Sequence, residues 1–247
     1  WVVIQYREGA TTKHWLEMYD LTDNSNVWSV QAQFGTCYAI DVDEDDNCYA
    51  ATSSVGLLGH DLAKFEPIAG VRSDFTDAGG QFMVNVNSGG PDVVISGGSE
   101  STVAPAVNNL YVSTLTDSSR AKMAVGGTYF AGTWNTYVIA NKGAFVHDNG
   151  FIYVMSHTPT CTLYKIQINR SGIEIASLTE VTSVAGPTHG VGIYVDQWGN
   201  IAVLNQDNGA TETDLIYYYD TDLNFISKID GLFPALRTWD SAVGGAW

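Results

Sequence analysis

Positive charge is scarce in this sequence. Its 247 residues hold 11 Lys and Arg against 27 Asp and Glu, which gives a formal net charge of -16 at pH 7. A chain this acidic repels the phosphate backbone of nucleic acids and the headgroups of anionic membranes, so we exclude nucleic acid as a partner. The acidity suits a cationic partner or divalent ions, and it also favours solubility in a salty or extracellular setting.

Cysteine and long apolar runs are also scarce. The cysteines Cys37, Cys48 and Cys161 are too few and too irregularly spaced for a disulfide framework or a zinc site, so we expect partly buried free thiols. Because no run of about 18 apolar residues occurs, we expect no membrane insertion. The sequence has no initiating Met and no leader, which indicates processing or a piece of a longer chain. We expect residues 1–247 to form one domain, in a virion or an extracellular setting.

A strand, turn, strand pattern recurs along the sequence. It occupies 39–51, returns at 192–204, and appears in a shorter form at 144–154. The residue after the first strand marks each unit, and the markers are Asp43, Asn87, His147, Asp196 and Asp240. Five units account for the whole chain if the last one continues from the C-terminus into the N-terminus. Such a period predicts a repeat architecture.

Each hairpin is followed by further candidate strands. Third strands are predicted at 15–20, 163–169 and 215–220, and fourth strands at 27–30, 123–125, 174–178 and 225–229. These runs are rich in Val, Ile, Tyr and Trp and end at Gly, Asn or Asp, while no stretch has a helical period. Four antiparallel strands per unit are typical of a β-propeller blade. The sequence therefore predicts an all-β, five-bladed β-propeller with almost no helix.

The two ends of the chain predict closure of the ring. Residues 237–243 read as a first blade strand without successors, and residues 1–6 read as a second strand without a predecessor. Pairing the N- and C-terminal strands in one blade would remove two exposed strand edges. An open solenoid would instead need a polar cap at each end, and the sequence contains no such unit.

Two segments exceed the blade pattern, at 97–106 and 126–139. Long loops on a regular scaffold often carry function. The flat amphipathic side chains of the second insert could bind a partner protein or a sugar. An extra strand that fills the space between two blades explains them equally well. The candidate contact residues are Tyr129, Phe130, Trp134 and Tyr137, together with Trp198 in a predicted turn.

The segment 19–52 and the hairpin 191–205 resemble the repeats of NHL-type and quinoprotein-like β-propellers. The resemblance implies a fold rather than an activity, because such propellers serve as enzymes, adaptors, lectins and virion components. These repeats are also similar to those of tail-associated or capsid-associated bacteriophage proteins. The resemblance therefore implies a β-propeller repeat protein of phage origin.

The densest acidic cluster has the spacing of a calcium loop. Asp41, Asp43 and Asp45 are the candidate ligands. However, the twelfth position is Thr52 where a bidentate Glu is needed, and the sixth is Asp46 where Gly is needed. We therefore favour a solvated turn and predict no metal.

No other pattern predicts catalysis. The histidines His14, His60, His147, His157 and His189 lack metal-ligand spacing. No G-x-S-x-G motif is present, and nothing indicates a quinone pocket. We predict no cofactor and no catalytic residue.

The predicted function is that of a non-enzymatic binding or assembly module, a structural protein of a phage virion that contacts other protein subunits. Two alternatives remain open. One is a lectin-like propeller that binds surface glycans. The other is a glycosidase or calcium-dependent hydrolase, whose carboxylates would come from Asp41, Asp43, Asp196 or Asp240.

Overall fold

The computed structural model describes residues 2–8, 13–32, 37–53, 60–76, 83–87, 90–100, 107–115, 120–124, 144–156, 161–187, 190–196, 198–205 and 215–229. Within these ranges every regular element is a β-strand and none is a helix. Consequently no helix in the described ranges is long and apolar enough to cross a membrane. The all-β prediction is confirmed for this part of the chain.

The described strands form five antiparallel sheets in which consecutive strands are neighbours. The first sheet has three strands, β1 (Val2–Glu8), β2 (Lys13–Tyr19) and β3 (Asn26–Ala32). The second holds β4 (Cys37–Val42), β5 (Cys48–Ser53), β6 (His60–Phe65) and β7 (Arg72–Thr76), and the third holds β8 (Met83–Asn87), β9 (Val93–Glu100), β10 (Val107–Thr114) and β11 (Arg120–Ala124). The fourth holds β12 (Ala144–Val146), β13 (Phe151–Ser156), β14 (Thr162–Ser171) and β15 (Glu174–Ala185), and the fifth holds β16 (Gly190–Val195), β17 (Ile201–Asn205), β18 (Leu215–Tyr219) and β19 (Phe225–Ile229).

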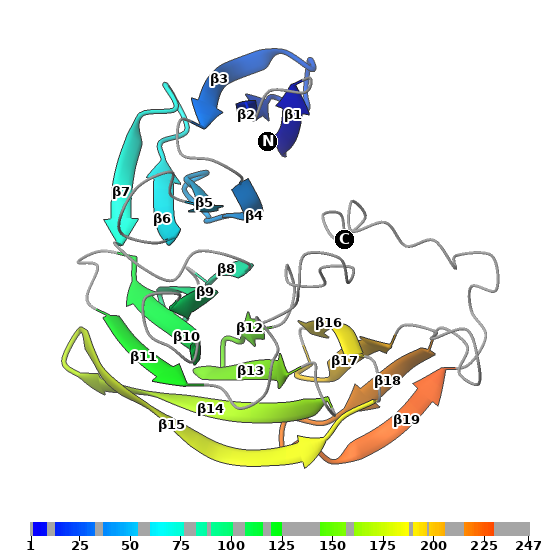
Figure 1. Cartoon of the computed structure of the whole chain (residues 1–247). Coiled ribbons are helices and arrows are strands. Elements are labelled where there is room, and N and C mark those ends of the chain that lie inside the picture. Colours follow the sequence, from blue (N-terminus) through cyan, green and yellow to red (C-terminus); the bar gives the residue numbers. More distant parts are fainter. Residues whose placement is uncertain are drawn as a thin grey trace.

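The sheets follow one another in chain order around a common centre (Figure 1). In each four-stranded sheet the first strand lies nearest the centre and the fourth lies outermost. Strand β8 lies beside both β4 and β12, and β12 lies beside β16. Radially arranged antiparallel sheets of this kind are the architecture of a β-propeller.

One turn geometry recurs in four hairpins. In the β4–β5 hairpin the N–H of Asp43 donates to the carbonyl oxygen of Asn47 at 3.1 Å, and the N–H of Asp46 donates to the carbonyl oxygen of Asp43 at 3.1 Å. The same two bonds close the turns that begin at His147, Asp196 and Asp220. The fourth residue of each turn has a positive φ, and these residues are Asp46, Gly150, Gly199 and Leu223. Glycine and Asp tolerate this conformation, which explains the repeated hairpin phrase.

Apolar side chains pack between neighbouring sheets. Trp28 of β3 is buried and stacks on Phe65 of β6, with ring centroids 6.1 Å apart. The β6–β7 turn lies against this pair, because a Cβ at Gly70 would come within 2.8 Å of Val30 and 2.9 Å of the Trp28 ring. Gly70 also has a φ of +60°, so both the close approach and the backbone conformation require glycine.

A larger apolar cluster joins the third, fourth and fifth sheets. Its buried members include Ile95, Leu110, Ile152, Leu163 and Val203. Two cysteines, Cys48 and Cys161, are buried and form no disulfide among the described residues. In the β4–β5 register Cys37 pairs with Thr52, and Cys48 pairs with Val42.

Polar side chains tie the inner strands together. The carboxylate of Asp41 on β4 accepts the backbone N–H of Val86 on β8 at 2.8 Å and the side-chain amide of Asn85 at 3.2 Å. The amide oxygen of Asn85 in turn accepts the N–H of Val146 on β12 at 2.9 Å. An inner strand has no partner strand on its central side, so these bonds satisfy backbone groups that the edge would leave open.

Candidate interaction face

Nearly all the described connections between strands lie on one face of the propeller. In an antiparallel meander the turn between the first and second strands and the turn between the third and fourth strands fall at the same end of the sheet. Bonds between turns of different sheets agree with this placement. The Asn87 amide donates to the Asp148 carboxylate at 2.7 Å, and the Arg170 guanidinium donates to the carbonyl oxygen of Pro91. We name this side, formed by 20–25, 43–47, 66–71, 90–92, 147–150, 170–174, 196 with 198–200, and 220–224, the turn face.

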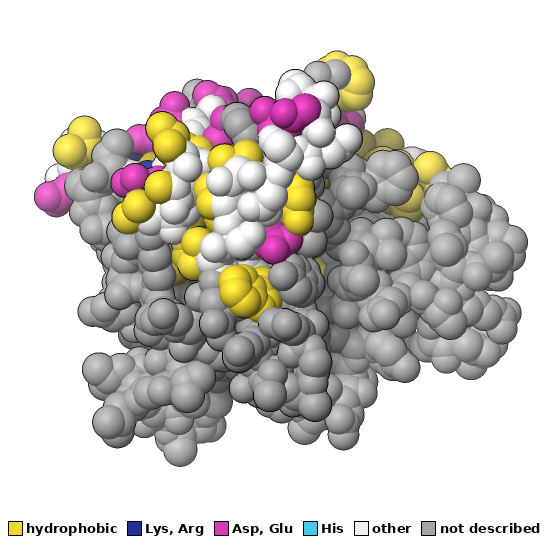
Figure 2. Space-filling model, turned by 90° about the horizontal axis from the view of Figure 1, so that it is seen from above, with side chains coloured by type: hydrophobic (Ala, Val, Ile, Leu, Met, Phe, Trp, Pro, Cys, Tyr) yellow, Lys and Arg dark blue, Asp and Glu magenta, His cyan; other side chains and the backbone are white. Residues whose placement is uncertain are grey.

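Carboxylates are dense on the turn face. The acidic residues in its turns are Asp20, Asp23, Asp43, Glu44, Asp45, Asp46, Glu66, Asp92, Asp148, Glu174, Asp196, Asp220 and Asp222, whereas Arg170 is the basic residue that these described turns contain. Figure 2 shows Asp and Glu side chains gathered along one edge of the molecule, with hydrophobic side chains beside them. The described turns are thus strongly anionic.

The turn geometry that recurs in this chain accounts for several of these carboxylates. Asp43 accepts the backbone N–H groups of Asp45 and Asn47 at 3.0 and 2.8 Å, and it also accepts the Tyr49 hydroxyl at 3.1 Å. Asp196 accepts the N–H groups of Trp198 and Asn200 at 2.9 and 2.8 Å. These side chains close their own turns, which is a structural use of the carboxylate.

Hydrogen bonds also lower the pKa values of three of the turn carboxylates. The side-chain and backbone bonds from Asn224 lower the pKa of Asp220, and those from Thr22 lower the pKa of Asp20. Burial alone would raise the pKa of Asp196, but the bonds from Asn200 and Trp198 outweigh it, and the pKa is lowered. Asp20, Asp196 and Asp220 are therefore held in the anionic form, and they serve as hydrogen-bond acceptors and not as acids.

The candidate calcium ligands do not act as one group. Asp41 bonds to strand β8, and Asp43 closes its own turn, as described above, while Asp45 is exposed and contributes its backbone N–H to Asp43. In the described part of the chain no group of three or more His, Cys, Asp or Glu is placed to hold a metal ion. His147 accepts the N–H of Asn149 through Nδ1 at 3.2 Å, which is again a turn contact.

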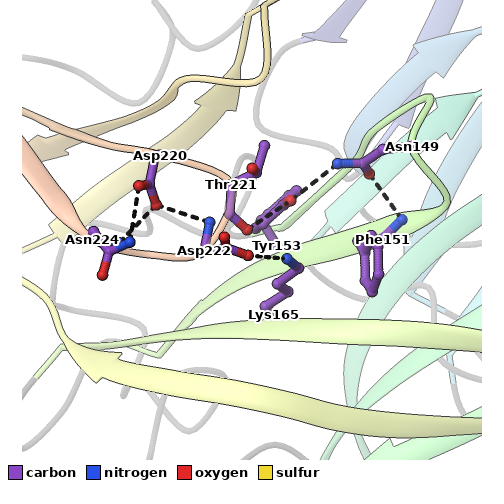
Figure 3. A network of polar contacts seen from close by, with 8 residues as sticks. All are labelled: Asn149, Phe151, Tyr153, Lys165, Asp220, Thr221, Asp222 and Asn224. Carbon is purple, nitrogen blue, oxygen red and sulfur yellow. Dashed lines mark hydrogen bonds and ion pairs between the residues drawn. The ribbon is translucent and has the colours of Figure 1, made fainter.

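A partly buried polar network ties the fourth sheet to the fifth (Figure 3). The Tyr153 hydroxyl donates to the carbonyl oxygen of Thr221 at 3.2 Å and accepts the Asn149 amide at 3.1 Å. The Lys165 ammonium lies 2.8 Å from the Asp222 carboxylate and 4.5 Å from the centre of the Phe151 ring. The pair joins β14 of the fourth sheet to the β18–β19 turn of the fifth, with the lysine buried and the aspartate exposed.

Burial shifts the pKa values of two tyrosines in this region. It raises the pKa of Tyr49 and of Tyr153, and the negative charge of Asp43 adds to the effect at Tyr49. Both tyrosines face a lysine across the strand pair, Lys64 and Lys165 respectively. Sequence reasoning missed this repeated Tyr and Lys pair, although a single lysine inside an apolar strand was a visible signal.

Among the candidate contact residues, the structure describes Trp198. Its side chain is 77% exposed in the β16–β17 turn, on the turn face. Tyr129, Phe130, Trp134 and Tyr137 lie outside the described residues, as do Asp240, His157 and His189. Further exposed apolar side chains in the turns are Leu21, Ile68, Val71 and Ile173. Composition gave no reason to expect aliphatic residues at these hairpin tips.

Comparison with known proteins places the chain by its fold alone. No family model matches the sequence, and no curated protein matches it significantly. Among solved structures, it is similar to Sqt1 of Chaetomium thermophilum bound to the N-terminus of ribosomal protein L10 (TM-score 0.59, 11% identity), with 93% of this chain and 58% of that chain covered. It is also similar to TolB of Acinetobacter baumannii (TM-score 0.55, 12% identity, 93% and 52% covered) and to the WD40 repeats of RRP9 (TM-score 0.53, 12% identity, 80% and 58% covered). The chain thus spans little more than half the length of these structures, and what it shares with them is the β-propeller fold.

Proposed function

We propose that this protein is a non-enzymatic binding module whose partners are other protein subunits. The observation that carries the proposal is the use of the turn carboxylates. Asp43 and Asp196, two of the carboxylates that a hydrolase would draw on, instead accept backbone N–H groups of their own turns, as Asp220 does. The turn face exposes carboxylates and apolar side chains to solvent. The sheets that carry it are joined by contacts of Asp41, Asn85 and Lys165.

The proposal includes a closed, five-bladed ring. The first sheet has three described strands, whereas each of the other sheets has four. In this sheet β1, β2 and β3 correspond to the second, third and fourth strands of a blade. Residues 237–243 have the pattern of the missing first strand. Pairing of 237–243 with β1, which is an edge strand among the described residues, would satisfy that edge and give the rigidity that an assembly subunit needs.

We further propose that the protein is an NHL-type propeller and that it belongs to a phage virion, with an extracellular setting as the alternative. The hairpins at 39–51 and 192–204 support this reading through their resemblance to NHL-type and phage repeats. Among the similar solved propellers, Sqt1 is bound to the N-terminus of another protein, which supports the protein-binding part of the proposal alone.

Sedimentation of native material tests the function. A lysate or culture of the source is separated on a density gradient, and peptides of this chain are followed by mass spectrometry. We expect them to travel with particles much larger than the monomer. Peptides found only at the position of the free monomer would contradict the proposal, and glycan binding by that free protein, lost on Trp198→Ala, would replace it with a lectin function.

A further inference from the structure

Two turns of the fifth sheet meet on the turn face. Ile201 at the start of β17 pairs with Tyr219 at the end of β18, so the β16–β17 turn and the β18–β19 turn lie side by side at the same end of the sheet. The two turns are in contact, because a Cβ at Gly199 would lie 2.7 Å from the methyl carbon of Thr221. They therefore form one continuous surface.

An exposed indole and an exposed carboxylate flank the contact between these turns. Trp198, which directly precedes Gly199, is 77% exposed. Asp222, which directly follows Thr221, has 76% of its side chain exposed, although it forms an ion pair with the buried Lys165. Exposed aromatic surface beside charge is typical of the residues that dominate protein interfaces.

Hydrogen bonds and core packing hold both turns in place. The Asp196 carboxylate accepts the backbone N–H of Trp198 at 2.9 Å, and the Asp220 carboxylate accepts the backbone N–H of Asp222 at 2.8 Å. The next residue, Leu223, is buried in the apolar cluster that joins the third, fourth and fifth sheets. Because the backbone of both turns is fixed, a ligand that binds the indole and the carboxylate would cost little ordering of the protein.

The charge of this surface is negative. The described residues of the two turns include Asp196, Asp220 and Asp222 and include no Lys or Arg. Lys165 of β14 compensates one of these three charges through its ion pair with Asp222. The remaining negative charge attracts cations, and the face of an indole attracts them as well.

We propose that Trp198 and Asp222 bind an arginine side chain of a partner protein. The inference rests on the proposed function and names the chemistry of the partner. A guanidinium group is planar, so it can stack on the indole while its N–H groups donate to the carboxylate, whereas the ammonium of lysine has no flat face. A neutral sugar would gain nothing from the charge of the turns, so the surface fits a cationic protein segment better than a glycan.

Binding of synthetic peptides to the purified full chain tests this directly. The probes are labelled peptides of the same length in which Gly and Ser alternate with Arg, with Lys or with Gln, and fluorescence anisotropy gives each Kd. We expect the Arg peptide to bind most tightly, the Lys peptide more weakly and the Gln peptide not at all, and we expect the affinity to fall as salt is raised. A Lys peptide that binds as tightly as the Arg peptide would overturn the assignment of arginine. A Gln peptide that binds as tightly, or no binding of the Arg peptide, would overturn the surface itself.

Matched variants locate the contact. Trp198→Leu keeps an apolar side chain but removes the aromatic face, so it should weaken binding of the Arg peptide by about fivefold, and Trp198→Phe should weaken it less. Asp222→Asn should weaken binding and flatten its salt dependence. The controls are Val181→Ser and Glu180→Gln on β15, where Val181 is 50% exposed away from the turns, and both should bind as the wild type does. Equal losses in test and control variants would place the contact elsewhere.

The native gradient separates this inference from the proposed function. The double variant Trp198→Leu with Asp222→Asn is produced in the source in place of the wild-type chain, and a smaller share of it should travel with large particles. If the wild-type chain and the double variant travel with them equally, the function stands and the surface is wrong. If the wild-type chain sediments as a free monomer, the proposed function fails whichever peptide binds.

Discussion

The bond between Asp41 and the N–H of Val86 carries a measurable part of the stability. It is 2.8 Å long and joins the inner strands of two sheets, and the same carboxylate also accepts the Asn85 amide. Replacing Asp41 with Ala leaves the Val86 N–H without its acceptor, at a cost of about 2 kcal/mol for a hydrogen bond to a charged group. With a urea m value of about 3 kcal/mol per molar, the midpoint of unfolding should fall by about 0.7 M.

Urea unfolding followed by far-UV circular dichroism measures this loss, and two variants control it. Asp45→Ala removes an exposed carboxylate of the same hairpin and should change the free energy of unfolding by less than about 0.5 kcal/mol. Asp41→Asn keeps one acceptor oxygen and should fall between the two. If Asp41→Ala costs no more than Asp45→Ala, the inner-strand ties do not hold the sheets together as we describe.

Three other predictions concern stability. Gly70→Ala should lower the free energy of unfolding by about 2 to 4 kcal/mol, because the added Cβ is both strained at a positive φ and crowded by Trp28. The control is Gly172→Ala, where φ is +65° and nothing lies within 4 Å of the added Cβ, so only the backbone strain should appear. Equal urea midpoints for the two variants would refute the contact with Trp28. Burial raises the pKa of Tyr219 to about 12, so its contribution is complete below the unfolded pKa of about 10 and is lost as the pH rises toward 12; Tyr219→Phe should flatten that part of the curve of stability against pH. The pKa of Asp220 is lowered from 3.8, so its contribution is present above that value and disappears as the pH falls through the lower folded pKa; an unchanged acid limb in Asp220→Asn would show that the turn bonds contribute nothing.

Local signals predicted the hairpins well. Asp43 with Asn47 and Asp196 with Asn200 stand at the ends of a tight turn, and Gly150 and Gly199 supply its positive φ, so the sequence carried the geometry on its own. For the same turn at Asp220 the sequence predicts only the end of a strand. The residue with the positive φ is Leu223, and leucine rarely adopts that conformation, so the sequence does not indicate the turn.

Features that depend on a neighbouring sheet could not be predicted. Asp41 was a candidate metal ligand from its spacing, yet its carboxylate bonds to Val86 of another sheet, which no local pattern indicates. The β14–β15 hairpin, Thr162–Ser171 and Glu174–Ala185, is longer than the predicted 163–169 and 174–178. Strand β15 packs beside β11, and a strand this rich in Ser and Thr shows little apolar alternation that would predict the contact.

The central claim is that the turn face contacts other protein subunits. Carbodiimide cross-linking of native particles followed by mass spectrometry tests it most directly, since this reagent joins carboxylates to lysines in contact with them. We predict cross-links from Asp23, Asp45 or Glu66 to lysines of another protein. Cross-links to partners that arise only from carboxylates off the turn face, such as Glu180, or a chain recovered without any partner, would contradict the account.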